Sequence, residues 1–554
     1  MADDVDNDAV TAAVVTLEWE PPDPGPWELD ASHQSEPASA TQQEVFPPQF
    51  KAGFRHAFAL YGLPLSHMEI RYVNGWSYMS AFVHGAPRKS SGKPPPAIVI
   101  KLLSRVPPSA RKRAKVAADA IERDVAMSEI ERWGRMRAGW IERNLEFQDV
   151  DLASCTDSEL ADQVRLTAAR FGEGARIHFE LISQVIPVGA YLARTAEWNI
   201  DQELASKAAF HGVRSSAEGQ QRLAAIATAI GDASVHDLDQ VRAHSPEAAA
   251  AVDDYLRHHG SWIMSDDIQS ETLAEMPGLV LQTIERHRAG LAGEQDGIDA
   301  AVAACRQAVP DAERSEFDTL LDRAQAAYAA LDDNSGLLAS WSGGLARRTH
   351  VEAARRLVER GALGSPAEIW ALVPGEIAGL LTGASTPSRE QIAERMVLRA
   401  AQAAAVPPAH LGSPPSPEPD PGLFPAAVGQ HVRHFGAFLA AKFGGGPQQA
   451  FGVGVEPATG RAVVAASPAD AIERVEPGDV LVTTYTTPAY NVIMSVLGGV
   501  VTVAGGPNSH TAIVARELGI PAVIGVSDAL ERISDGSMIT VDPIAATVVE
   551  VADG

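Results

Sequence analysis

The residue of this sequence with the most chemically informative neighbours is His510, one of 16 histidines among 554 residues. It follows a glycine pair, Gly505 and Gly506, which permits a tight turn and the close approach of a bulky group to the backbone. The β-branched run 500–503 before this pair predicts a buried strand, and residues 510–518 after it predict a short helix. The sequence therefore predicts that His510 lies where a glycine turn opens into a helix.

A histidine at the start of a helix is suited to carry a phosphoryl group. Free amide donors and the positive end of the helix dipole favour a dianion there, and they disfavour a standing positive charge on the ring. An imidazole that stays neutral is nucleophilic, as the acceptance of a phosphoryl group requires. On position alone, a capping histidine without chemistry is the alternative. The phosphate-supporting candidates are Gly505, Gly506, Ser509, Thr511 and Arg516, although Arg516 lies nearly two turns along the helix, where a structural pairing with a carboxylate is favoured.

The elements that position His510 are expected to form a compact α/β domain over residues 450–554. Short β-branched runs alternate there with helical segments, as in a domain whose helices cover one sheet. The predicted strands are 480–484, 500–503, 522–526, 538–541 and 547–551.

The larger part of the chain predicts helices with a small sheet near its start. Residues 16–402 show helical spacing of apolar residues, and we expect one large, mainly α-helical domain there, in one or two lobes. Within it, residues 50–61 predict a helix and residues 68–73 a strand. The pair Asn74-Gly75 then predicts a hairpin turn.

Two segments are expected to lie outside these domains. Residues 1–15 are acidic, small and without pattern, which predicts a disordered tail. Residues 403–449 predict a proline-rich linker and a connecting helix, because prolines crowd the stretch 407–422. Such a stretch is typical of a semi-rigid tether between moving domains, and an inert surface loop is the alternative.

The composition excludes several classes of protein. A net charge of -26 argues against a nucleic-acid partner, which needs a basic surface. The two cysteines, Cys155 and Cys305, are far apart and predict neither a disulfide framework nor a metal site. The N-terminus lacks the regions of a signal peptide, and no apolar run approaches the roughly 18 residues of a membrane span. We therefore expect a cytoplasmic protein that binds neither membrane nor nucleic acid.

The segment around His510 closely resembles the phosphohistidine swivelling domain of enzymes that use phosphoenolpyruvate (PEP). That family has two glycines, a short spacer, Ser-His, and then Ala-x-Val-Ala-Arg-x-x-Gly-x-Pro-Ala-Val. The resemblance covers residues 450–554 and implies that His510 is the phosphohistidine. The residues that match are Gly505, Gly506, Ser509, His510, Ala512, Val514, Ala515, Arg516, Gly519, Pro521, Ala522, Val523 and Gly525.

The resemblance also indicates which modules to expect. A full PEP synthase joins an ATP-grasp module, the swivelling domain and a barrel that binds PEP. Because the first 400 residues offer mainly helices and the sequence stops after the swivelling domain, we expect neither of the other two modules. Lys101, beside a strand predicted at 98–100, is a weak candidate for a nucleotide site.

The helical region resembles the substrate-binding region of rifampicin phosphotransferase-type proteins in the blocks 19–30, 70–75 and 255–260. In that family the order is ATP-grasp module, helical acceptor-binding domain and histidine domain. The resemblance therefore implies a split enzyme similar to phenylphosphate synthase, in which a separate ATP-grasp subunit loads the histidine. ATP and Mg²⁺ would be bound by that partner. The acceptor would be a small hydroxyl compound of the phenol, cresol or benzylic alcohol type, with AMP and phosphate as co-products.

Candidates for the acceptor site are less specific. His178 lies in a block similar to the family's helical domain, and His258 and His259 precede a glycine; a histidine on a helix is more often a packing or surface residue. Arg347 belongs to a basic cluster with a possible steering role, for which a solvated helix face is the alternative. Trp76 would suit an aromatic acceptor, although core packing is favoured.

Three functions remain open from the sequence. The first is the catalytic subunit of a two-component, ATP-dependent phosphotransferase. The second is a regulatory protein in which phosphorylated His510 passes its group to no small molecule, and the third is a complete single-chain kinase, for example an antibiotic phosphotransferase component. The sequence identifies neither the acceptor nor the general base.

Overall fold

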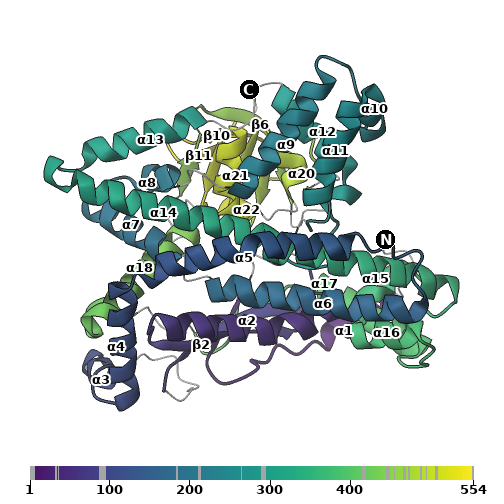
Figure 1. The fold of residues 1–554 in the computed structure, drawn as a ribbon, viewed down its shortest axis with the longest axis horizontal. Helices are drawn as coiled ribbons and strands as arrows, with labels where there is room; N and C mark the ends of the chain where they lie inside the picture. Colours follow the sequence, from purple (N-terminus) through teal and green to yellow (C-terminus); the bar gives the residue numbers. More distant parts are fainter. Residues whose placement is uncertain are drawn as a thin grey trace. The chain divides into compact units, whose positions relative to one another are not determined.

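The chain is described by a computed structural model that divides into two compact units. The first unit holds residues 1–183, 257–275 and 333–431, and the second holds 184–256, 276–332 and 432–554. The described residues are 7–30, 34, 36–85, 95–181, 185–209, 214–263, 265–288, 295–414, 419–443, 450–454, 456–465, 470–471, 474–486, 490–494, 496–503, 505 and 509–551. Most of them are helical, as predicted, and the second unit ends in an α/β part (Figure 1).

The first unit is built around α6, against which α2, α15 and α16 pack. Figure 1 shows α2 and α6 side by side. Thr156 caps α6 and forms a capping box with Glu159, which fixes where the helix begins. The helices of this unit are α1 (Asn7–Val15), α2 (Ala40–Leu60), α3 (Ala97–Leu103), α4 (Pro108–Glu122), α5 (Val125–Gln148), α6 (Asp157–Glu180), α15 (Trp341–Glu359), α16 (Pro374–Leu381) and α17 (Arg389–Ala404).

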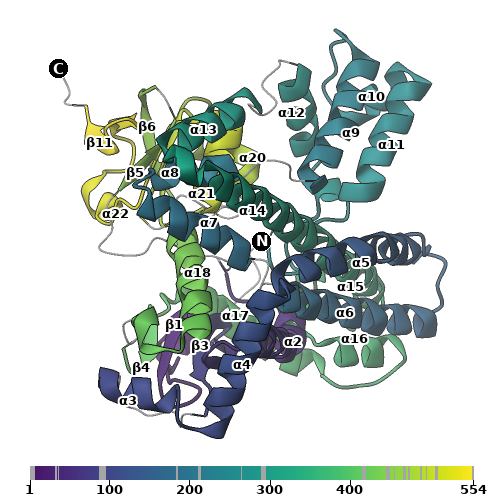
Figure 2. The same cartoon turned by 60° about the vertical axis from the view of Figure 1, so that its left-hand side comes forward.

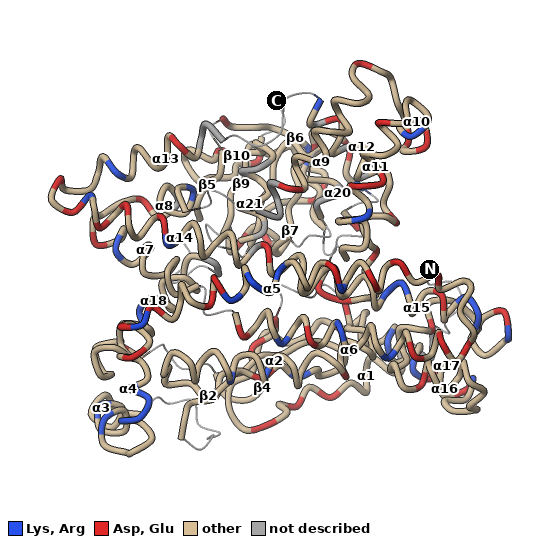
Figure 3. The backbone as a smooth tube through the Cα atoms, in the orientation of Figure 1, with Lys and Arg blue, Asp and Glu red and all other residues tan. Residues whose placement is uncertain are grey.

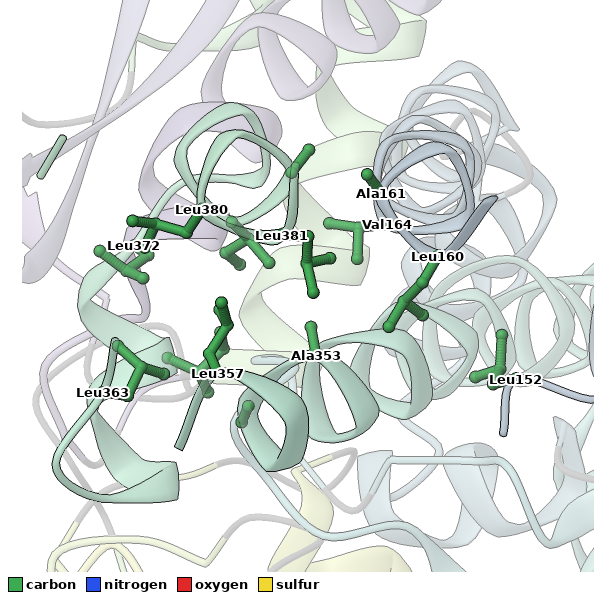
Figure 4. Close-up of a cluster of buried hydrophobic side chains, with 14 of the residues drawn as sticks. Leu152, Leu160, Ala161, Val164, Ala353, Leu357, Leu363, Leu372, Leu380 and Leu381 are labelled. Atoms are coloured by element: carbon green, nitrogen blue, oxygen red, sulfur yellow. The ribbon is translucent and has the colours of Figure 1, made fainter. Parts of the chain in front are cut away.

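An apolar cluster joins α6, α15 and α16. Leucines from the three helices point toward one another in the close-up of Figure 4, among them Leu160, Leu357 and Leu381. All three are almost fully buried. Burying such side chains contributes roughly 1.5–3 kcal/mol each, and this contribution outweighs weak helix propensity.

His350 is a buried histidine of α15 whose polar atoms are satisfied. Its Nδ1 lies 2.7 Å from the Ala346 carbonyl oxygen, to which it donates, and its Nε2 lies 3.0 Å from the Thr41 hydroxyl. Burial lowers the pKa of His350 from its usual value to about 4. This ring therefore stays neutral in the folded protein.

We expect acid to destabilise the first unit through His350. Because the folded pKa lies below the unfolded value of about 6.5, the stabilisation is complete above pH 6.5 and is lost as pH falls toward 4. The loss should approach roughly 3 kcal/mol. Denaturant unfolding of the wild type and of His350→Gln at several pH values measures it. An unchanged pH dependence in the variant would refute this role for the histidine.

A four-stranded sheet belongs to the same unit, with the order β2-β3-β1-β4 and antiparallel pairing throughout. The predicted hairpin is confirmed, since Asn74 and Gly75 have positive φ of 50° and 76° and join β2 to β3. Figure 2 shows β1, β3 and β4 together. The strands are β1 (Pro26–Leu29), β2 (Leu65–Val73), β3 (Trp76–Val83) and β4 (His410–Gly412).

Three local predictions were wrong. The tail 1–15 was predicted to be disordered, but its described part forms α1, which packs against α17 and gains stability from that contact. The helix predicted over 50–61 begins ten residues earlier, because Ser39 caps α2 and packing on α6 carries the helix through Pro47 and Pro48. The strand predicted at 98–100 is helical and belongs to α3.

The proline-rich stretch is also different from the free tether that was predicted. Its residues 410–412 are β4, the edge strand of the sheet, and the Tyr78 hydroxyl donates to the Pro408 carbonyl at 2.8 Å. The described part of 407–422 is therefore bound to the first unit. The chain passes from the first unit to the second further on, inside α18 (Ala426–Phe443).

The second unit contains helices and the C-terminal sheet. Pairs of helices pack together, such as α8 with α13 and α9 with α12. Among the described helices of the whole chain, none combines the length and apolar character that crossing a membrane requires. Besides α18, the helices are α7 (Val185–Glu197), α8 (Gln202–Ala209), α9 (Arg214–Ile230), α10 (Leu238–His244), α11 (Pro246–His259), α12 (Pro277–Arg288), α13 (Gln295–Ala308) and α14 (Arg314–Asn334), of which α11 and α14 end in the first unit.

The C-terminal sheet has seven strands in the order β11-β10-β6-β7-β8-β9-β5, and its central four are parallel. Alternate residues face opposite sides: Leu481 and Val500 pack with α21, whereas Val480 and Val501 pack with α22. The five predicted strands are confirmed. The elements are β5 (Phe451–Val453), β6 (Ala458–Val464), β7 (Val480–Thr483), β8 (Gly499–Thr502), β9 (Ala522–Ile524), β10 (Met538–Asp542), β11 (Thr547–Glu550), α20 (Asn491–Met494), α21 (His510–Leu518) and α22 (Ala529–Arg532).

Candidate functional site

His510 is the first residue of α21, as the sequence predicted. The chain reaches it from the end of β8 at Thr502, through a turn that contains Gly505. Gly505 has φ of +132°, and an added Cβ would lie 2.9 Å from both Ile524 Cγ2 and Ser509 Oγ. A side chain is therefore excluded at this position by both the backbone and the space. The predictions for Gly506 and for the side chains of His510 and Arg516 lie outside the described residues.

Ser509 and Thr511 fix the start of α21. The Ala512 amide donates to Ser509 Oγ at 3.3 Å, which is the capping bond that the sequence predicted. Thr511 is buried, and its hydroxyl lies 2.9 Å from the Thr486 hydroxyl, in the loop after β7. Thr511 thus ties the first turn of α21 to the neighbouring strand-end loop. Any support that it gives to a phosphate remains a prediction.

The turn before His510 lies at the edge of the sheet where parallel strands end. Because β7, β8 and β9 run parallel, their carboxyl ends share one edge. Open α/β sheets bind their ligands at this edge. Thr502, the last residue of β8, has a buried hydroxyl without a hydrogen-bond partner among the described residues. The backbone therefore places His510 where amide donors of a helix and a strand edge meet, which suits a phosphoryl group.

Comparison with known proteins agrees with this geometry. Residues 475–545 match the family described as PEP-utilising enzyme, mobile domain. This part of the chain is therefore a domain of that kind.

The relatives of this part carry the names of phosphotransferases. Phosphoenolpyruvate synthase of Escherichia coli is 54% identical over 70 residues, which are 13% of this chain and 9% of that protein. The enzyme of the same name from Aeropyrum pernix is 48% identical over 85 residues, 15% of this chain and 10% of that protein. Rifampicin phosphotransferase of Streptomyces sviceus is 48% identical over 66 residues, 12% of this chain and 8% of that protein. The chain thus spans a tenth or less of each of these relatives.

All five acceptor-site candidates belong to the first unit, whereas His510 belongs to the second. His178 Nδ1 lies 2.7 Å from Asn334 Oδ1, to which it donates. His259 is buried, with its ring 5.1 Å from that of Trp262, and His258 precedes it near the end of α11. These contacts place the three histidines on two helices, and their proposed part in acceptor binding stays a prediction.

Trp76 and Arg347 have clear structural contacts. The Trp76 indole is buried in the N-terminal sheet and donates to the Gln402 carbonyl at 3.0 Å. Arg347 donates to Glu275 at 2.7 Å and to the Gln269 carbonyl at 2.6 Å, which holds the loop 265–275 in place. Core packing and loop anchoring therefore account for the burial of these two side chains.

The first unit also holds a polar cluster that the sequence patterns did not predict. Its centre is Asp267, which accepts from the Ser39 amide at 2.7 Å and from the Gln269 amide at 3.0 Å. Burial raises the pKa of Asp267 above its ordinary value, although these hydrogen bonds and Arg399 oppose the rise. Burial also raises the pKa of Glu36, and the charge of Asp267 adds to that rise. A carboxyl group whose pKa is raised is poised to accept or give a proton nearer neutral pH.

Tyr72 and Gln42 complete this Asp267 cluster. Burial raises the pKa of Tyr72 well above its ordinary value, the charge of Asp267 adds to the rise, and the hydrogen bond with Gln42 opposes it. Gln42 is buried, and its Oε1 has no hydrogen-bond partner among the described residues. An acceptor atom in this state costs free energy unless a ligand or water donates to it. Among the described residues, no group of three His, Cys, Asp or Glu side chains is arranged to hold a metal ion.

Proposed function

We propose that this chain is the phosphohistidine-carrying, acceptor-binding subunit of a two-component, ATP-dependent phosphotransferase. The observation that carries the proposal is the place of His510, the first residue of α21 behind a glycine turn, in a domain similar to those of PEP synthase and rifampicin phosphotransferase. The acceptor would be a small hydroxyl compound of the phenol, cresol or benzylic alcohol type.

The reaction would proceed in two half-reactions. In the first, a separate nucleotide-binding protein with bound Mg²⁺ would bring ATP to His510. An imidazole nitrogen would form a bond to the β-phosphorus, AMP would leave, and water would take the γ-phosphoryl group as inorganic phosphate. In the second, the acceptor hydroxyl would attack the phosphorus in line, and the N–P bond would break. The described residues outside 450–551 support the need for a partner, because they form helices and one four-stranded sheet.

The Asp267 cluster is our candidate for the acceptor site. An acceptor hydroxyl must lose its proton as it attacks phosphorus, and a carboxylate with a raised pKa is suited to take it. The unpartnered Gln42 Oε1 and the hydroxyl of Tyr72 would hydrogen-bond to the polar end of the same molecule. We therefore assign Asp267 as the proton acceptor and Gln42 and Tyr72 as orienting residues.

Discharge of the loaded protein tests this function. His510 is phosphorylated chemically with phosphoramidate, phenol or a benzylic alcohol is added, and the phosphate on the peptide that holds residue 510 is followed in time. We expect transfer to the hydroxyl compound, and we expect Asp267→Asn to slow it roughly a hundredfold. The matched control is Asp266→Asn, at the exposed neighbouring position, which should discharge at the wild-type rate. A wild-type protein that transfers its phosphate to no hydroxyl compound would overturn the proposed function.

A further inference from the structure

Helix α3 exposes an apolar surface that a folded protein normally buries. It has only 7 residues, Ala97–Leu103, and the apolar side chains on it and just after it are open to solvent. Helices that are apolar on most of their circumference are usually covered. The exposed fractions are 62% for Ile98, 37% for Val99, 53% for Leu102, 56% for Leu103 and 61% for Val106, and we call these five residues the α3 surface.

The first unit holds α3 firmly in this exposed position. Arg105, just after the helix, donates to the carbonyl oxygens of Leu423 and Phe424, the latter at 2.6 Å. Ser104 also donates to the Leu423 carbonyl, at 3.2 Å. The next helix, α4, is fixed to the end of α2, because Arg113 donates to the Phe58 carbonyl at 3.2 Å. A surface held in this way loses little conformational entropy when it binds a partner.

The region around the α3 surface is basic, in contrast to the rest of the chain. No Asp or Glu stands between Glu69 and Asp119, although the whole chain has a net charge of -26. Figure 3 shows blue segments on α3 and α4. Four basic side chains here are exposed and form no ion pair with a described carboxylate; they are Lys101, Arg111, Lys112 and Lys115.

We propose that the α3 surface and these four basic residues are the docking site of the nucleotide-binding partner protein, an inference that rests on the proposed function. The partner would offer an apolar groove with carboxylates along its rim. Ile98 and Leu102 are four residues apart, as are Val99 and Leu103, which is the spacing of side chains that anchor a helix in a groove. The basic residues would pair with the rim and raise the rate of association.

Two other occupants fit less well. In a symmetric dimer, two α3 surfaces would meet and the two sets of unpaired basic residues would repel each other. A membrane surface is disfavoured because α3 is only about 10 Å long and because residues 95–118 contain no aromatic side chain to anchor them. A protein groove satisfies both the apolar residues and the charges.

Loading of His510 tests the docking site. The purified full chain is incubated with ATP labelled at the β-phosphorus and with a cell extract of the organism that encodes it. We expect the wild type to be loaded and Leu102→Asp to be loaded about thirtyfold more slowly. The matched control is Leu166→Asp on α6, where a leucine is exposed to 48% and which should load like the wild type. Equal loading by phosphoramidate in all three proteins checks that the histidine domain is intact.

The outcomes separate this inference from the proposed function. If wild type and Leu102→Asp are loaded at the same rate, the docking site is wrong and the proposed function stands. If the extract never loads wild-type His510, the proposed function fails and the docking site fails with it. A photo-crosslinking residue at position 102 identifies the occupant: an adduct with a nucleotide-binding protein is expected, whereas an adduct only with lipid or with a second copy of this chain would overturn the inference.

Discussion

Replacing His510 with alanine is expected to abolish phosphoryl transfer completely, which is the largest effect of any single substitution in this chain. The alanine side chain has no nucleophile, and the phosphohistidine pathway has no other carrier atom. Label from ATP and chemical loading by phosphoramidate should both disappear from the peptide that holds residue 510. His56→Ala, at an exposed position of α2, is the control and should keep full activity.

The fold of the C-terminal domain should survive that substitution. Position 510 is the first residue of α21, and alanine is compatible with the first turn of a helix. Circular dichroism and the unfolding midpoint of His510→Ala should therefore match the wild type. Residual turnover above about one thousandth of the wild-type rate would show that another group carries the phosphate.

The largest effect on stability is expected from Gly344→Ala. A Cβ at this position of α15 would lie 1.5 Å from the Ser261 carbonyl oxygen and 2.6 Å from its carbon. Both are backbone atoms, so the helix and the loop must move apart. We expect a loss of roughly 3–5 kcal/mol in the free energy of unfolding.

Gly134→Ala is the matched control for that loss. It also replaces a helical glycine of the first unit, in α5, but no atom lies within 4 Å of the added Cβ. This variant should be more stable than the wild type, by roughly 0.5–1 kcal/mol, because alanine is the better helix former. Chemical denaturation of both variants measures the difference. Equal stability of Gly344→Ala and the wild type would refute the close packing of α15 on Ser261.

Local sequence signals predicted the parts of the fold that short-range chemistry determines. Asn74-Gly75 permits the positive φ values of a hairpin, and the β-branched runs after residue 480 form strands because both faces of their sheet are covered. The position of His510 was predictable for the same reason, since Gly505, Ser509 and the helix that follows are neighbours in sequence.

Long-range contacts determine the rest, and the sequence patterns did not predict them. Asp267 accepts from Ser39, 228 residues earlier, and nothing in its own turn indicates that partner. Burial by distant segments raises its pKa, so its chemistry is visible only in the folded protein. The strand predicted at 98–100 has β-branched residues, but Pro96 begins a helix there. The free tether was wrong because β4 finds an edge of the N-terminal sheet.

The position of the label after ATP turnover tests the role of His510 most directly. The chain is incubated with its cell extract and with ATP labelled at either the β- or the γ-phosphorus, and the peptide that contains residue 510 is analysed. We predict that the β label appears on His510 as an acid-labile, base-stable phosphate, while the γ label is released as inorganic phosphate. A γ label retained on this peptide, or a β label at another residue, would contradict the proposed phosphoryl carrier.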